Sequence, residues 1–113
     1  MQAAIQAVHS EPPTDWRQVV ALYDHLLALT PTPMIALNRA VAVAELTGPA
    51  TALPLVDALR VALGEHHLFH ATRAALLRRL NRTDEAAAAY AEAAAHTRNA
   101  VERAFLDRRR GEL

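Results

Sequence analysis

Apolar residues recur along the chain at helical spacing, in segments separated by proline, glycine and asparagine residues. Within residues 16–29, for example, apolar positions fall three and four residues apart, which lines one face of an α-helix. Such segments bounded by turn-forming residues are typical of helices joined by short turns. The pattern predicts seven helices, over residues 1–9, 16–29, 33–47, 50–62, 67–80, 84–96 and 100–110.

Residues with short polar side chains stand at the expected starts of several helices. Thr14 or Asp15 can cap the second helix, Thr32 the third and Asn99 the last, because their side-chain oxygens accept hydrogen bonds from free backbone amides. Thr83 is the expected cap of the helix over 84–96. The local sequence therefore defines the helix boundaries in several places.

The chain also contains an internal repeat with a period of 34 residues. The matched pairs are Ala40 with Ala74, Val43 with Leu77, Ala52 with Ala86, Val56 with Tyr90, and Leu59 with Ala93. This is the period of tetratricopeptide (TPR) repeats, in which a small residue lets two helices cross closely. We expect one all-α domain over residues 1–113, a right-handed superhelical stack of TPR-like helical hairpins that the last helix caps.

Composition supports this fold class and narrows the function classes. Alanine, the strongest helix former, accounts for 26 of 113 residues. The formal net charge is zero, which argues against a stand-alone nucleic-acid-binding protein. The chain has no cysteine, and we find no signal peptide and no apolar run long enough to span a membrane. These features predict a cytoplasmic protein.

The sequence offers little for catalysis or metal binding. His66 and His70 are four residues apart on one predicted helix, but a zinc site needs a third ligand, and His67 stands where a zinc protease has glutamate. No serine-based triad and no glycine-rich phosphate loop can be assembled, since Ser10 is the only serine and the chain has three glycines. We therefore expect no enzyme activity, no metal and no cofactor.

The helix over 33–47 is apolar on almost every side, yet Asn38 and Arg39 lie in its middle. Buried amides and guanidinium groups need hydrogen-bond partners, or they must face water. In the 34-residue repeat, Asn38 is equivalent to Thr72 and Arg39 is equivalent to Arg73. Asn38, Arg39, His70 and Arg73 could thus line a groove that grips a carboxylate or carbonyl of a partner protein. Alternatively, Asn38 and Arg39 belong to an internal network with turn carbonyls or with an acid such as Asp57.

Several motifs in the chain match one known group of proteins. The most specific is the LNRAVAV block of residues 37–43. The others are Asp15, Trp16, Tyr23, Leu26 to Leu29, Thr32, Pro33, Gly48, Pro49, residues 67–71, Arg73, Ala74, residues 76–80, Glu85, Ala86, Ala89, Tyr90 and residues 102–106. With these motifs, nearly the whole chain resembles the C-terminal extension of extracytoplasmic-function (ECF) RNA polymerase sigma factors of an actinobacterial type. His66 departs from the tyrosine expected before His67.

The resemblance implies a TPR-like fold and a fragment of a longer sigma factor, whose DNA- and polymerase-binding regions are absent. It implies a regulatory protein-interaction domain that modulates transcription initiation through contacts with its own sigma regions or with core RNA polymerase. DNA would be contacted only by the absent regions. The alternatives are a free-standing TPR-type adaptor unrelated to transcription and, more remotely, a small metal-binding protein built on the histidines. An alanine-rich face over 86–95 could also form a homodimer.

Overall fold

The computed structural model describes residues 13–113, and these residues form helices joined by short turns. The predicted helix over residues 1–9 lies outside the described residues. In chain order, the helices are α2 (Trp16–Leu29), α3 (Pro33–Thr47), α4 (Pro49–Asp57), α5 (Arg60–Leu63), α6 (His67–Arg79), α7 (Thr83–His96) and α8 (Ala100–Gly111). The all-helical class is therefore confirmed for residues 13–113.

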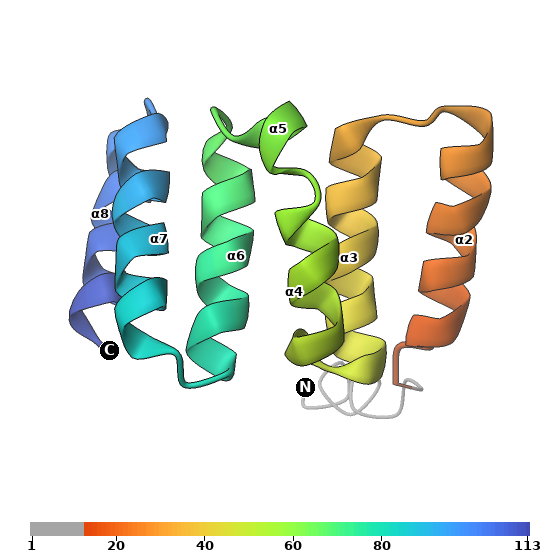
Figure 1. Cartoon of the computed structure of the whole chain (residues 1–113), viewed down its shortest axis with the longest axis horizontal. Coiled ribbons are helices and arrows are strands. Elements are labelled where there is room, and N and C mark those ends of the chain that lie inside the picture. Colours follow the sequence, from red (N-terminus) through yellow and green to blue (C-terminus); the bar gives the residue numbers. More distant parts are fainter. Residues whose placement is uncertain (1–12) are drawn as a thin grey trace, which may run out of the picture.

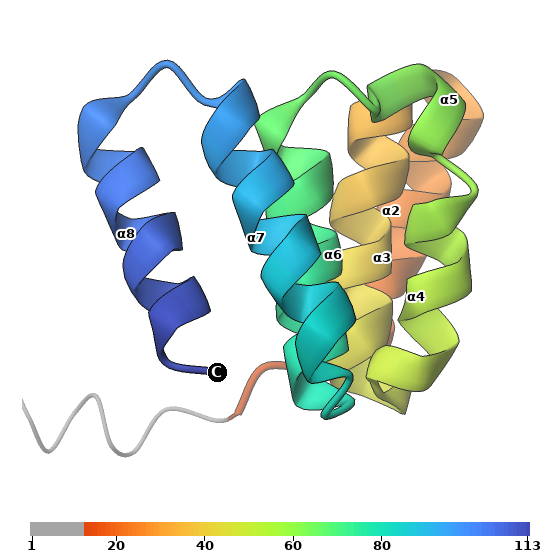
Figure 2. The ribbon, with the colours of Figure 1, turned by 60° about the vertical axis from the view of Figure 1, so that its left-hand side comes forward.

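The long helices stand side by side in a row, with α2 at one end and α8 at the other (Figure 1). Each packs mainly on its neighbours in the chain, and α4 also packs on α6. Turning the molecule shows α8 beside α7 and the group α2, α3 and α4 on the far side of α6 (Figure 2). Neighbouring helices run in opposite directions, as short turns require.

Capping side chains begin the helices largely where the sequence predicts. The side chains of Asp15, Thr32 and Asn99 accept hydrogen bonds from the amides of Gln18, Ile35 and Glu102, at 3.2, 3.2 and 3.0 Å. The prediction for Thr83 is wrong, because Thr83 is itself the first residue of α7 and the preceding residue makes no side-chain cap.

The predicted helix over 50–62 is interrupted, which corrects the sequence analysis. It forms α4 and α5, with a turn at Ala58 and Leu59. In this turn the amide of Leu59 donates to the carbonyl of Val56, at 2.9 Å, in place of the regular helical partner. The change of direction allows Leu63 to join the core. Burial of an apolar side chain thus overrides the helical propensity of the segment.

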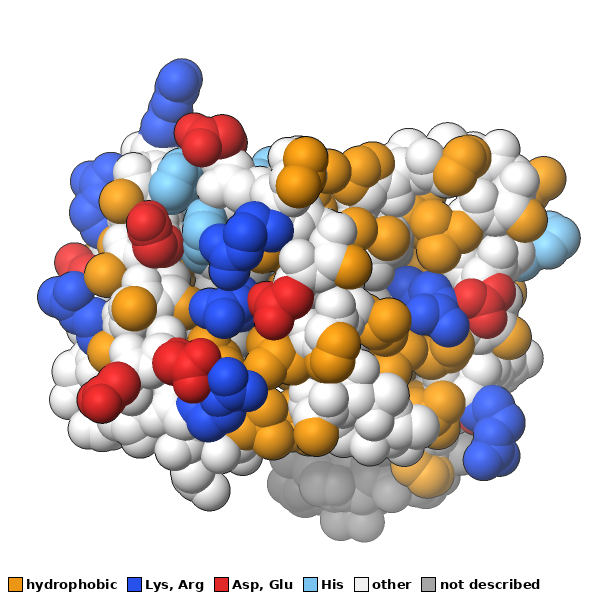
Figure 3. Space-filling view, viewed as in Figure 1, with side chains coloured by type: hydrophobic (Ala, Val, Ile, Leu, Met, Phe, Trp, Pro, Cys, Tyr) orange, Lys and Arg blue, Asp and Glu red, His pale blue; other side chains and the backbone are white. Residues whose placement is uncertain are grey.

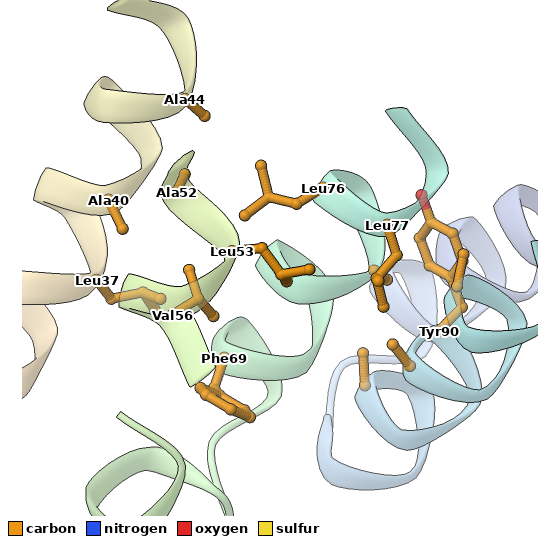
Figure 4. Packing of buried hydrophobic residues seen from close by; sticks show 14 of the residues in the cluster. Leu37, Ala40, Ala44, Ala52, Leu53, Val56, Phe69, Leu76, Leu77 and Tyr90 are labelled. Carbon is orange, nitrogen blue, oxygen red and sulfur yellow. The ribbon is translucent and has the colours of Figure 1, made fainter. Parts of the chain in front are cut away.

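The core lies between α3, α4, α6 and α7. Its largest fully buried side chains are Phe69, Leu37, Leu77 and Val56. Figure 4 shows Leu37 and Val56 close to Phe69, and Leu77 facing Tyr90. Of the ten residues paired by the 34-residue repeat, nine are buried and Leu59 is partly buried. The repeated positions are therefore those that pack.

Gly48 joins α3 to α4 in a backbone conformation that other residues avoid, with φ of +103° and ψ of 161°. We expect Gly48→Ala to lower the free energy of unfolding by about 1–3 kcal/mol because only glycine adopts this conformation without strain. Gly111→Ala is the matched control, since an added Cβ has open space at both positions but Gly111 lacks the positive φ. Urea unfolding followed by circular dichroism measures both, and equal effects would contradict the explanation.

Candidate protein-binding groove

A mostly apolar groove lies between α3 and α6, the helices that carry equivalent positions of the repeat. It has a volume of about 340 Å³. Its lining residues come from both helices and are Val41, Ala44, Glu45, Ala71, Thr72, Ala75, Leu76 and Arg79. The small alanine side chains leave the space between the helices open, and we call this site the α3–α6 groove.

An ion pair crosses between the two helices at the groove. Arg79 Nη1 lies 3.0 Å from Glu45 Oε2, and both side chains are partly exposed. These two residues are 34 positions apart and therefore occupy the same place in successive repeats. The groove thus offers apolar surface beside one acidic and one basic group, which suits a protein segment with apolar side chains and polar flanks.

Arg39 and Arg73 form a repeated pair of contacts, but they do not line this groove. Arg39 Nε lies 2.6 Å from Asp24 Oδ1 on α2, and Arg73 Nε lies 2.7 Å from Asp57 Oδ1 on α4. Each arginine therefore joins its helix to the helix that precedes it in the row. Asp57 is the partner of Arg73, whereas the sequence analysis considered it for Arg39.

We expect Arg39→Ala and Arg73→Ala each to lower the free energy of unfolding by less than about 1 kcal/mol. Both ion pairs are partly exposed, and such pairs contribute little because water screens them. Chemical denaturation of the two variants measures the free energy of unfolding. Asp57→Asn is the control for Arg73→Ala, because it removes the charge of the same ion pair from the other side. A loss of several kcal/mol would show instead that the guanidinium groups hold a buried network.

The structure places the two remaining predicted site residues apart. Asn38 is exposed on α3, so its amide can face water without the internal network that the sequence analysis considered. His70 is buried, and its Nε2 donates to the carbonyl oxygen of Gly64 at 2.7 Å. His70 therefore supports the turn after α5 and does not line a groove.

Histidines and glutamates gather where the loops before α6 and after α7 meet. His70 stacks on His96, with ring centroids 4.9 Å apart. His67 Nε2 lies 3.0 Å from Glu102 Oε1, a carboxylate that also accepts a hydrogen bond from the buried Thr97. Within residues 13–113, no group of three metal-binding side chains is placed to hold a metal ion. The stacked histidines join α6 to α7, and the contact of His67 with Glu102 joins α6 to α8.

Side chains of both charges lie close together on the face drawn in Figure 3. Figure 3 also shows hydrophobic side chains gathered over α2, α3 and α4. At the start of α7, Arg82 and Glu85 form two hydrogen bonds of 2.7 and 2.8 Å. These bonds lower the pKa of Glu85 and raise that of Arg82.

The predicted homodimer over residues 86–95 stays a prediction, because Ala88 and Ala95 are exposed and Ala87 and Ala91 are partly exposed. Ala86, Ala89, Ala93 and Ala94 are buried, because α7 packs on both α6 and α8.

Within residues 13–113, no helix is both long enough and apolar enough to cross a membrane.

Comparison with known proteins identifies a longer relative. An uncharacterized protein of Rhizobium meliloti (strain 1021) is 42% identical over 110 residues, which cover 94% of this chain and 26% of that protein. The chain thus spans about a quarter of the relative's length. No protein-family model matches the chain, and no solved structure matches it significantly.

Proposed function

We propose that this chain is a TPR-like regulatory domain of an ECF RNA polymerase sigma factor, which modulates transcription initiation by binding its own sigma regions or core RNA polymerase. The proposal rests mainly on the position of the LNRAVAV block, residues 37–43, in the structure. This block, the most specific part of the resemblance, lies within α3, and α3 forms one wall of the α3–α6 groove.

The repeated geometry supports the TPR-like part of the proposal. The equivalent alanines Ala40 and Ala74 are both buried where helices cross. The contacts of Arg39 with Asp24 and of Arg73 with Asp57 recur one repeat apart. A stack of equivalent helical hairpins has one continuous face formed by its first helices, and such faces bind extended partners.

The groove chemistry supports a protein partner. Its apolar lining and the neighbouring Glu45 and Arg79 match the composition of protein interfaces, in which an apolar centre has a polar rim. The zero net charge does not favour direct binding to nucleic acid. The length of the Rhizobium relative is also compatible with a domain that acts beside other regions of one protein.

Calorimetric titration of the purified chain tests this function. One titration uses the sigma regions of the full-length protein, and a second uses core RNA polymerase. Binding of either partner supports a role in transcription. If a folded sample binds neither partner, the test moves to transcription assays. These compare the full-length sigma factor with a version that lacks this domain. Equal transcription by the two would overturn the proposal and favour the free-standing adaptor.

A further inference from the structure

Helix α8 carries an apolar side that no described helix covers. The helix stands at one end of the row and packs mainly on α7, with Leu106 buried (Figure 1). The side chains of Val101 and Phe105, by contrast, are 81% and 46% exposed. With Ala104 and Arg108 they follow a spacing of three and four residues, which places all four on one side of the helix. Exposed apolar side chains grouped in this way mark a contact surface.

A shallow groove of about 680 Å³ follows this side of α8, and its lining includes all four residues and Glu102. We call it the α8 groove. The carboxylate of Glu102 is already engaged, because its Oε1 accepts a hydrogen bond from Thr97 and lies 3.0 Å from His67 Nε2. Arg108 forms no ion pair with any acidic side chain among residues 13–113. The groove therefore presents one basic group that can pair with a partner's acid.

Phe105 and two arginines form the centre of this surface. The guanidinium carbons (Cζ) of Arg108 and Arg109 lie 5.7 and 5.8 Å from the centroid of the Phe105 ring. Arg109 also has an acidic neighbour, since its Nη1 lies 3.4 Å from Glu112 Oε1. Aromatic and arginine side chains are enriched at the centres of protein interfaces and supply much of their binding energy. The composition of the α8 groove is thus that of an interface centre.

A single-stranded nucleic acid fits this arrangement less well than a protein does. Proteins that bind such strands stack successive bases on several aromatic rings. Phe105 is the only exposed phenylalanine, tyrosine or tryptophan among residues 13–113. The two guanidinium groups also lie over its ring, where a base would have to stack. The formal net charge of zero gives no general attraction for phosphates either.

We propose that the α8 groove binds an amphipathic protein segment whose apolar side chains cover Val101 and Phe105 and whose carboxylate pairs with Arg108. The planar donors of an arginine match a carboxylate through two parallel hydrogen bonds. Covering the Phe105 ring removes water from this ion pair and so strengthens it. The α8 groove shares no lining residue with the α3–α6 groove. The proposal does not depend on the proposed function.

Fluorescence anisotropy of a labelled synthetic peptide tests the proposal. The probe is a helical peptide with leucines on one face and glutamates on the others, and the comparison peptide has lysines in place of the glutamates. We expect only the glutamate peptide to bind saturably. Phe105→Ala should raise its Kd by about tenfold, because truncating an aromatic side chain at an interface centre commonly has this effect. Arg108→Gln should raise its Kd by about fivefold, because it removes one ion pair at a partly exposed site.

Arg110→Gln is the matched control, since it removes the same charge two residues further along α8, on another side of the helix. We expect its Kd to stay within about twofold of that of the unmodified chain. Circular dichroism confirms the folding of each variant. Equal weakening by Arg108→Gln and Arg110→Gln, or equal binding of the lysine peptide, would overturn the proposal in favour of unspecific attraction.

Three further results would also overturn the proposal. The first is no saturable binding of the glutamate peptide up to about 1 mM, the weakest affinity of interest here. The second is weakening by Val41→Glu but not by Phe105→Ala, which would place the peptide in the α3–α6 groove. The third is tighter, Phe105-dependent binding of a labelled single-stranded oligonucleotide, which would assign the surface to nucleic acid. None of these measurements uses sigma regions or polymerase, so the two proposals are tested separately.

Discussion

Replacement of Phe69 by alanine is expected to lower the free energy of unfolding by about 3–5 kcal/mol, a large part of the stability of a small domain. Phe69 is fully buried in the core. Its ring meets the edge of His70 with centroids 5.0 Å apart, and the Arg60 guanidinium lies 5.2 Å from its centroid. The substitution would leave a cavity and remove these contacts. Urea unfolding followed by circular dichroism measures the loss.

Phe105→Ala is the matched control, because it removes the same side chain from a largely exposed position on α8. Arg108 and Arg109 lie near the Phe105 ring, but such contacts at exposed sites contribute only about 0.5–1 kcal/mol. We therefore expect a loss of about 1 kcal/mol or less. Similar losses for the two variants would mean that Phe69 does not anchor the core.

The sequence predicted the local features of this fold well, because they depend on neighbouring residues. Asp15, Thr32 and Asn99 cap helices through amides only three positions away. Asn81 follows α6 with a φ of 60°, the left-handed conformation that asparagine tolerates at the end of a helix. The spacing of buried alanines was also predictable, since it follows from the periodicity of packed helices.

The groove residues were harder to predict, because they depend on how separate hairpins meet. The sequence analysis considered either a groove lined by Arg39, Arg73 and His70 or an internal network for Arg39. In the structure Arg39 contacts Asp24 of α2, Arg73 contacts Asp57 of α4, and His70 is buried. A signal for the ion pairs exists in the sequence. Asp24 and Asp57 are 33 residues apart, almost the repeat period, and a search for repeated acids would have matched them to the repeated arginines.

The lining of the α3–α6 groove could have been found by the same reasoning. Val41 and Ala75, like Glu45 and Arg79, are 34 residues apart. What the sequence could not give is which side of α3 remains open. Helix α3 is apolar nearly all round, so periodicity alone does not distinguish the face covered by α2 and α4 from the face left to a partner. That distinction comes from the packing.

If the proposed function holds, Val41→Glu is expected to weaken binding of the chain to the proposed sigma or polymerase partner by at least tenfold, while leaving its stability nearly unchanged. Val41 is partly exposed in the α3–α6 groove, so the free protein can accommodate the carboxylate in water. A partner that fills the groove would bury this charge against Ala44 and Ala75. The one base in the groove lining, Arg79, is already paired with Glu45, and burying an unpaired charge is costly. Calorimetric titration against whichever partner binds the unmodified chain measures the effect.

The matched control is Val61→Glu, which introduces the same charge at a fully exposed valine on α5, outside the groove. We expect it to bind like the unmodified chain. A uniform decrease for both variants would indicate a general electrostatic effect, which added salt would reverse because salt screens exposed charges. Unchanged binding by Val41→Glu would place the contact on another face of the domain. Because Arg39 and Arg73 already bind aspartates, the groove between α3 and α6 is the surface whose substitution should separate binding from folding.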